Sequence, residues 1–370
     1  MFGRIGAVMG KEFRHIVRDP RSLAIVLIMP IIMTFLYGYA INLDIKNIPL
    51  GLVDHDVSPE SRQLAEAFLE SGQFILTARY PDGEEAELGM RRRETVITLV
   101  VPRGYGERET TPDPLPVQIL VDGSNGNTAS VALSYAQGIL ARRIREILLA
   151  RLGGELPIEL EPRYWYNPEL KSSHFIVPGL IAVIMMMAAA MLTSVTVVRE
   201  KESGTLEQLL VSPVRSGELM IGKVLPYGVL GLADGAFILI FGALLFGVPV
   251  RGSLWVLLGF TTLYILAALT IGLLISTLVR QQQLAMLVAM LVTVLPSFML
   301  SNFIFPLRSM PPFLQLVSHA VPARYFIPIV RGVLLKGLDA DALWSYGIYL
   351  AGFAILLTLV SIIRFRPRLD

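Results

Sequence analysis

The chain of 370 residues contains no cysteine and only four histidines. Without cysteine, neither a disulfide framework nor a thiolate metal site can stabilise it, so each folded part depends on its own core. The histidines lie at His15, His55, His174 and His319, without the H-x-x-x-H spacing typical of metal ligands. We therefore expect no metal site, no catalytic residue and no cofactor bound by this chain.

Charged residues are also scarce. They make up 17% of the chain, whereas ordinary soluble domains contain about 25%, and 54% of the residues are hydrophobic. This composition is typical of a membrane protein. The formal net charge is only +2 and the sequence has no overall basic patch, so we expect no nucleic-acid partner.

Long uncharged runs divide most of the sequence, and a run of about 20 apolar residues can cross a bilayer as a helix. Five runs contain no Asp, Glu, Lys or Arg, namely residues 22–43, 175–198, 252–279, 284–307 and 342–363. A sixth run, 224–250, is interrupted only by Asp234. The sequence therefore predicts an α-helical polytopic membrane protein with six transmembrane helices.

Lysine and arginine are concentrated on one side of these runs. They gather in the N-terminal segment 1–21, in the loop 199–223 and in the tail 364–370, whereas the loop between the third and fourth transmembrane helices has only Arg251. Because cytoplasmic loops carry the excess of Lys and Arg, these three segments are predicted to be cytoplasmic, the first as an interfacial helix. Segment 308–341 is then extracytoplasmic or re-entrant, although it also carries Lys and Arg.

The first run, 22–43, is longer than the roughly 7 to 15 residues of a signal-peptide core. Asp19 and Pro20 before it are typical of a helix start. We expect this run to remain as a membrane anchor.

Residues 44–174 separate the first two transmembrane helices and are predicted to form an inserted α/β domain outside the cytoplasm. Short β-rich runs predict strands at 49–54, 74–80, 95–101 and 117–122. Ser58 followed by Pro59 predicts a helix start, and residues 127–151 predict a long amphipathic helix.

Segment Gly217–Val224 matches most of the phosphate-binding pattern G-x-x-x-x-G-K. However, Val224 stands where Ser or Thr would bind Mg²⁺, and no buried strand precedes the segment. We interpret it as a loop leading into a membrane helix. With no ATP-binding motif, the chain is not expected to be an enzyme.

A charged interlude, residues 197–223, lies between the second and third transmembrane helices. Thr205 to Gln208 fit a capping box, and Leu206, Leu209 and Leu210 then share one helix face. The short helix is expected to end at Ser212–Pro213. Its apolar edge fits two alternatives: docking into a groove of a soluble partner, or lying among lipid headgroups.

The stretch "REKESGTLEQLLVSPVRSGELMIGKVLPY" (199–227) resembles the loop between the second and third transmembrane helices of ABC-2 type transporter permeases. "GKEFRHIVRDPRSLAIVLIMPIIM" (10–33), "YNPELKSSHFIVPGLIA" (166–182) and "PARYFIPIVRGVLLKG" (322–337) are similar to further stretches of that family. The segment 44–174 is similar to the large periplasmic domain of its drug-export-like branch.

This resemblance implies a multi-pass permease of the bacterial cell inner membrane that exports a hydrophobic drug or lipid-like compound. ATP and Mg²⁺ would be bound by a separate ABC ATPase subunit. The permease would form a homodimer, or a heterodimer with a second permease. It would also contact membrane lipid, and a periplasmic adaptor protein is a further candidate partner. The residues that the resemblance assigns to ATPase coupling are Glu200, Glu202, Gly204, Thr205, Leu206, Glu207, Leu209, Leu210 and Pro213.

Asp234 supports a competing interpretation, because intramembrane carboxylates often relay protons or contact cargo. An ion-coupled secondary transporter that uses Asp234 is therefore an alternative, as is an exporter of a polysaccharide or peptide. The other interpretation of Asp234, which we favour slightly, is a structural buried carboxyl, neutral or hydrogen-bonded between helices.

Overall fold

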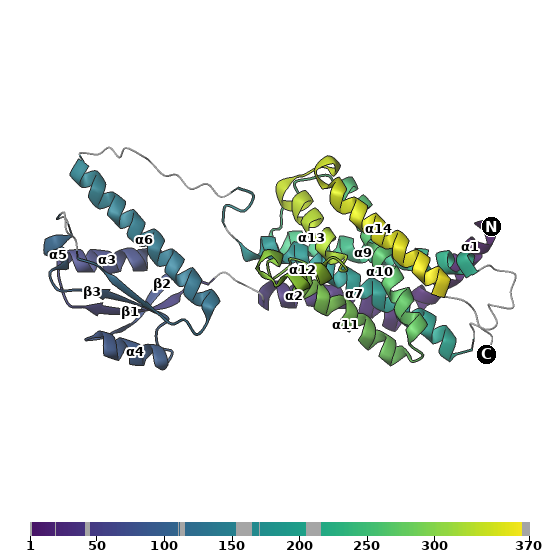
Figure 1. The fold of residues 1–370 in the computed structure, drawn as a ribbon, viewed down its shortest axis with the longest axis horizontal. Helices are drawn as coiled ribbons and strands as arrows, with labels where there is room; N and C mark the ends of the chain where they lie inside the picture. Colours follow the sequence, from purple (N-terminus) through teal and green to yellow (C-terminus); the bar gives the residue numbers. More distant parts are fainter. Residues whose placement is uncertain are drawn as a thin grey trace. The chain divides into compact units, whose positions relative to one another are not determined.

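The computed structural model describes residues 2–18, 20–40, 45–109, 111, 115–152, 165–169, 171–204 and 216–364. The chain divides into two compact units (Figure 1). One unit comprises Met1–Asn42 and Tyr164–Asp370, and the other comprises Leu43–Arg163.

The first unit is helical. Its elements are α1 (Phe2–Arg18), α2 (Pro20–Ala40), α7 (Ser172–Glu202), α9 (Ser216–Phe246), α10 (Leu254–Leu278), α11 (Gln282–Leu300), η1 (Leu307–Ser309), α12 (Pro312–Ser318), α13 (Ala323–Arg331), the π-helical η2 (Gly332–Lys336) and α14 (Ala340–Arg364).

Within the described residues, five helices are long and apolar enough to cross a membrane, in α7, α9, α10, α11 and α14. The pair α12 and α13–η2 passes the same test together but is bent by 80°, as a broken span or a re-entrant loop would be. The apolar stretch described in α2 is shorter, Ile28–Tyr39. The chain is thus a multi-pass membrane protein.

Several helix ends differ from the ends of the apolar runs. α11 stops at Leu300 although the run continues to residue 307, because Asn302 adopts a left-handed backbone (φ 63°). α9 stops at Phe246, before Gly247 at φ 64°. Conversely, α7 continues beyond its run to Glu202, so the first charged residues of the predicted loop belong to the helix.

Helix α7 forms the centre of this unit. Every residue from Ile176 to Ala190 is buried, and the helix packs against α9, α10, α11 and α13. Small residues permit this packing: a Cβ atom at Gly272 of α10 would lie 2.2 Å from the carbonyl oxygen of Ala190. Such close approach of backbones is typical of helix contacts in membranes.

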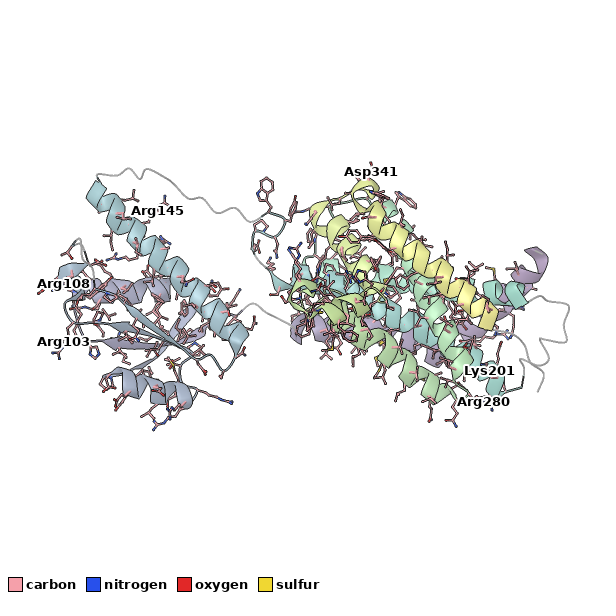
Figure 2. The ribbon with its side chains drawn as sticks, in the orientation of Figure 1. Arg103, Arg108, Arg145, Lys201, Arg280 and Asp341 are labelled. Carbon is pink, nitrogen blue, oxygen red and sulfur yellow. The ribbon has the colours of Figure 1, made fainter. Side chains whose placement is uncertain are left out.

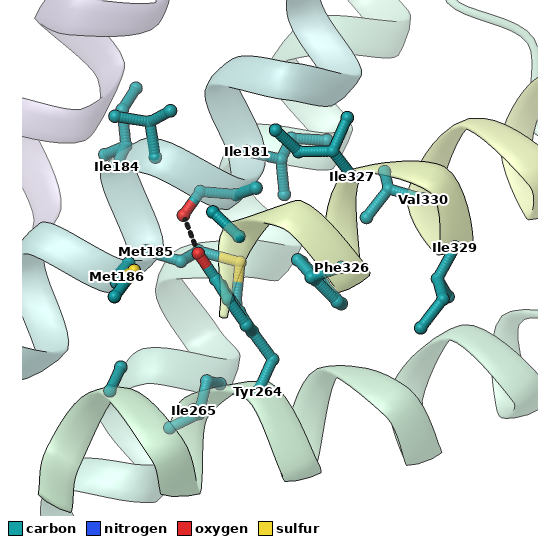
Figure 3. Close-up of a cluster of buried hydrophobic side chains, with 14 of the residues drawn as sticks. Ile181, Ile184, Met185, Met186, Tyr264, Ile265, Phe326, Ile327, Ile329 and Val330 are labelled. Atoms are coloured by element: carbon teal, nitrogen blue, oxygen red, sulfur yellow. Dashed lines mark hydrogen bonds between the residues drawn. The ribbon is translucent and has the colours of Figure 1, made fainter. Parts of the chain in front are cut away.

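Tyr264 of α10 connects three helices in this core (Figure 3). Its hydroxyl donates a hydrogen bond of 2.7 Å to the carbonyl oxygen of Ala182 in α7. Its ring stacks on Phe326 of α13, with centroids 4.0 Å apart. A fully buried tyrosine thus satisfies its polar atom while packing its ring.

The α12–α13 segment is fixed to its neighbours by Arg331. Its guanidinium donates to the carbonyl oxygens of Phe175, Asn302 and Phe303, at 3.0, 3.1 and 3.2 Å. It also lies over the Phe175 ring, 3.7 Å from the centroid. One side chain therefore binds the start of α7 and the chain that follows α11.

The second unit contains a four-stranded sheet in the order β2-β1-β3-β4. Its strands are β1 (Ile48–Asp54), β2 (Phe74–Arg79), β3 (Ile97–Val101) and β4 (Gln118–Val121), and its helices are α3 (Pro59–Glu70), α4 (Gly83–Arg91), α5 (Tyr105–Arg108) and α6 (Gly126–Leu152). β1 pairs in parallel with β2 and β3, whereas β3 and β4 are antiparallel. The four predicted strands are confirmed to within two residues.

Helices α3 and α6 cover one face of this sheet and α4 covers the other (Figure 1). Leu64 and Phe68 of α3 are fully buried in the same cluster as Leu50 and Leu99 of the sheet. The start of α3 is as predicted, because the Ser58 hydroxyl accepts a hydrogen bond from the Ser61 amide and Pro59 occupies the first turn.

Candidate functional site

The last turn of α7 carries Arg199, Glu200, Lys201 and Glu202, directly before the predicted coupling loop. The helix ends there because Gly204 adopts φ 67°, and the amides of Ser203 and Gly204 donate to the carbonyl oxygens of Arg199 and Lys201 in this last turn. Basic residues in a last turn also complement the helix dipole. The turn is therefore a well-capped and highly charged helix end.

Glu200 joins this turn to two other helices. One carboxylate oxygen accepts a hydrogen bond of 2.9 Å from Lys11 of α1. The other pairs with Lys223 of α9, whose side chain is 7% exposed. A carboxylate with two cations is favourable here because Glu200 is itself 8% exposed and a single buried charge would be costly.

A second polar contact fixes α1 to the helical unit. Glu12 of α1 is 1% exposed, and its carboxylate accepts from the Tyr227 hydroxyl of α9 at 3.4 Å. The Tyr227 oxygen accepts in turn from Thr196 of α7 at 2.9 Å. Together with Lys11, these contacts bind α1 to both α7 and α9.

The other side of the turn contacts α10 and α11. Lys201 donates to the carbonyl oxygen of Ser276, in the last turn of α10. The Glu202 carboxylate accepts from the backbone amide of Gln282 at 2.9 Å and also from its side chain. Arg199 donates to the Gln282 side-chain oxygen at 3.3 Å. Because Gln282 begins α11, Glu202 also places a negative charge at a helix N-terminus.

Four helices therefore meet at one helix end: α1 and α9 through Glu200, α10 through Lys201, and α11 through Glu202 and Arg199. Figure 2 shows Lys201 and Arg280 close to one another at this end of the unit. We call the residues Lys11, Glu12, Thr196, Arg199, Glu200, Lys201, Glu202, Lys223, Tyr227, Ser276 and Gln282 the α7 terminal network.

The network includes only part of the predicted coupling set. Glu200 and Glu202 belong to it, and Gly204 ends the helix beside it. The remaining predicted residues, Thr205, Leu206, Glu207, Leu209, Leu210 and Pro213, lie outside the described residues.

Sequence reasoning missed Glu12, Lys223 and Tyr227 as members of a network. One signal was available: Glu12 is the single acidic residue of α1, a helix that is otherwise basic or apolar. The second was the opposite charge of Glu200 and Lys223 at the adjoining ends of consecutive long helices.

Asp234 lies in the middle of α9 and is 1% exposed. Neither of its carboxylate oxygens has a hydrogen-bond partner within the described part of the chain. Burial of an ionised carboxylate without a partner is strongly unfavourable. Asp234 therefore favours either a proton on its carboxyl or a polar or cationic group supplied from elsewhere.

Comparison with known proteins gives a consistent result. The sequence profile of the family described as "ABC-2 family transporter protein" matches residues 20–363. The chain is 34% identical to the probable multidrug ABC transporter permease YbhS of Escherichia coli (strain K12), over 99% of this chain and 98% of YbhS. It is 30% identical to the probable multidrug ABC transporter permease YbhR of the same strain, over 93% of each chain. It is 25% identical to the inner membrane transport permease YhhJ of that strain, over 96% of this chain and 95% of YhhJ.

Glu200 provides a test of the α7 terminal network. Glu200→Gln leaves Lys223 buried without its anion, and breaking a buried pair in this way costs roughly 3 to 5 kcal/mol. We expect a lower temperature of thermal unfolding in detergent. Replacing both charges with apolar residues, Glu200→Leu with Lys223→Met, should recover much of this loss, because no buried charge then remains in the pair.

Arg14→Gln serves as the control, because Arg14 is exposed and its side chain bonds to Gly10 of its own helix. Its unfolding temperature should remain close to that of the wild type. A Glu200→Gln protein that unfolds like the wild type would show that the network contributes little to stability.

Proposed function

This chain belongs to the ABC-2 family of transporter proteins, and we propose that it is the membrane-spanning permease subunit of an ATP-driven exporter that works with a separate ATPase subunit. The α7 terminal network is the observation that supports a coupling role most directly. It attaches the helix end before the predicted coupling loop to α1, α9, α10 and α11. A displacement of that loop would therefore be passed to four helices at once.

In the mechanism that we propose, ATP closes a pair of ATPase subunits, and the loop between α7 and α9 moves with them. The charged contacts of Glu200, Lys201 and Glu202 transmit this movement to the helices. The helices then open a path between two permease subunits, as a homodimer or a heterodimer. Rigid-body movement of packed helices is a common form of such a transition.

We further propose a six-span arrangement in the bacterial inner membrane, with α2 as the first span and both ends of the chain in the cytoplasm. The excess of Lys and Arg around α1 and the α7–α9 loop supports this orientation. The sheet-containing unit, which follows α2 and precedes α7, then lies outside the cytoplasm, where it could contact an adaptor protein. The relative YhhJ is an inner membrane transport permease, which agrees with this location.

A hydrophobic drug or lipid-like compound is the cargo we propose. The permeases YbhS and YbhR are described as probable multidrug transporters. The long helices of this chain carry mainly apolar side chains, both buried and exposed. A polysaccharide or peptide cargo is the alternative at this point.

Asp234 supports a second candidate function, proton- or cation-dependent transport. Its carboxylate is buried in α9 without a hydrogen-bond partner among the described residues. Such a group can take up a proton or contact a cationic part of the cargo during transport. This role can coexist with ATP-driven export or replace it.

The orientation can be tested by labelling, because the chain contains no cysteine. Ser130→Cys, in α6 of the sheet-containing unit, should react with a membrane-impermeant thiol reagent in intact cells. Ser216→Cys, at the start of α9, should react only after the membrane is opened. Mass spectrometry of the labelled protein gives the readout, and the reverse pattern would refute the orientation.

The coupling loop can be tested through its predicted apolar edge. If Leu206 and Leu210 are buried against an ATPase, replacing both with Ala should cost about 1 to 4 kcal/mol for each well-buried side chain. We expect weaker ATPase co-purification or hydrolysis without export. Glu207→Lys should have the same effect, because it reverses a charge beside that edge.

Leu287→Ala with Leu291→Ala is the matched control, since these leucines have the same spacing and are 53% and 48% exposed on α11. A loop that only lies on the membrane predicts a different result: Glu207→Lys should be neutral or slightly favourable, by about 1 kcal/mol of attraction to anionic headgroups. Normal ATPase binding and export by Glu207→Lys would exclude the coupling assignment.

Asp234→Asn tests the second candidate function. The amide has nearly the same shape but cannot exchange a proton, so we expect impaired export with an unchanged protein level and unchanged assembly. Asp341→Asn, at the exposed start of α14, is the control and should export normally. Unchanged export by Asp234→Asn would leave Asp234 with a structural role only.

A further inference from the structure

An apolar groove lies between α7, α9, α10 and α13, with a cavity volume of about 470 Å³. This volume is in the range of roughly 300 to 1,000 Å³ that is usual for small-molecule sites. Its walls are formed by Ile181 and Met185 of α7, by Leu232, Gly235, Ala236, Leu239 and Ile240 of α9, by Leu254, Trp255, Leu257, Leu258 and Thr261 of α10, and by Phe326 and Val330 of α13.

The floor and the rim of the groove differ in exposure. Ile181, Met185, Phe326 and Val330 belong to the buried cluster in Figure 3 and form a rigid floor. At the rim, Ile240, Leu254 and Trp255 are 52%, 56% and 80% exposed. Because α7, α9 and α10 are long and apolar enough to cross a membrane, we expect this open side to face lipid hydrocarbon.

The low polarity of the groove walls indicates which kind of ligand can bind there. The polar side-chain groups of the lining residues are the Thr261 hydroxyl and the Trp255 indole N–H, and none of these residues is charged. Sites for drug-sized molecules normally contain several polar groups that orient the ligand. The walls therefore fit an unfunctionalised hydrocarbon chain better than a polar or cationic compound.

Asp234 does not contribute to the groove. Leu232, Gly235, Ala236 and Leu239 follow the spacing of one helix face, and they line the groove. Asp234 is two positions from both Leu232 and Ala236, which places it about 200° around the helix from each of them. The two features lie on different faces of α9 and can be changed separately.

Polar anchors lie at one end of the groove, where α10 begins. Arg251 is exposed, and its backbone amide donates to the carbonyl oxygen of Leu334 at 3.1 Å. The amide of Gly252 donates to Val333 at 3.0 Å, so this short connection is held against η2. Trp255 follows within the first turn of α10. Tryptophan and arginine at the end of a membrane helix are typical of the headgroup level.

We propose that this groove binds one acyl chain of a membrane phospholipid, with the Arg251 guanidinium beside the lipid phosphate. The chain would pack between α9, α10 and α13 and would extend the apolar core to the membrane. Its preference over bulk lipid comes from the concave walls and from the phosphate contact, since hydrocarbon alone gains nothing on leaving other hydrocarbon. This site is separate from the proposed cargo and coupling functions.

The test uses the full chain, purified in detergent and stripped of lipid. A phosphatidylethanolamine with a photoreactive diazirine in one acyl chain is titrated in and irradiated, and the labelled peptides are mapped by mass spectrometry. We expect labelling of the peptides around residues 235–240 and 254–261 to saturate at about one lipid per chain. Labelling of other lipid-facing helices should rise linearly.

Ala236→Phe fills the groove from an exposed wall position and should remove the saturable component. Val229→Phe is its matched control on α9, because Val229 is 54% exposed and does not line the groove. Its saturable labelling should equal that of the wild type. If Ala236→Phe fails to fold, Leu258→Trp fills the same groove from α10 and should give the same loss.

Arg251→Gln should weaken apparent lipid affinity about fivefold, since it removes one cation near the phosphate. A diazirine fatty alcohol, which has no phosphate, should bind wild type and Arg251→Gln alike. Linear labelling everywhere in the wild type would overturn the proposal. An Ala236→Phe variant that folds and keeps saturable lipid labelling would also overturn it. If that variant also loses export of a lipophilic compound, the groove is a cargo site instead.

Discussion

The carboxylate of Glu200 holds Lys11 and Lys223 at the end of α7, and the arrangement of the other helices at that end depends on these contacts. An α-helix that is buried along its length can leave the membrane only where its backbone and charges find partners. Here α1, α9, α10 and α11 supply such partners. The same turn is therefore both the end of the central helix and the junction of its neighbours.

This junction explains why α1, outside the apolar runs, is part of the helical unit. Its buried Glu12 accepts from Tyr227, and its Lys11 binds Glu200. In a helix that lay only among lipid headgroups, a carboxylate would remain solvated, whereas Glu12 is 1% exposed. Arg331 connects helix ends in a similar way but binds neutral acceptors: its guanidinium donates to the carbonyl oxygens of Phe175 in the first turn of α7 and of Asn302 and Phe303 after α11. Charged side chains thus position the helices mainly at their ends, and apolar packing around Tyr264 holds their middles.

The sequence predicted those features that depend on local pattern. Long uncharged runs located α7, α9, α10, α11 and α14, and β-rich runs located the strands, because burial in lipid or in a sheet constrains neighbouring residues directly. It did not predict the helix ends at Phe246 and Leu300, which depend on backbone angles at Gly247 and Asn302 rather than on hydropathy. It also did not pair Glu200 with Lys11, 189 positions away. Such a contact, like a groove assembled from four helices, exists only after the helices have packed. The family resemblance did point to the segment in which Glu200 lies, as the loop between the second and third transmembrane helices. A resemblance depends on the order of residues and not on their contacts.

Helix α9 shows how one apolar span can serve two environments. Its face with Tyr227, Asp234 and Ile238 is buried in the bundle, whereas its face with Leu232, Ala236 and Ile240 borders an open groove. Asp234, whose carboxylate has no hydrogen-bond partner among the described residues, lies on the first face, where protein surrounds it. On the second face the groove walls are apolar apart from the Thr261 hydroxyl and the Trp255 indole N–H. The two faces therefore separate a buried carboxyl from an apolar groove within the width of one helix. Because adjacent turns of α9 carry both, a lipid that fills the groove would press on the same helix that positions Asp234, without touching its carboxylate.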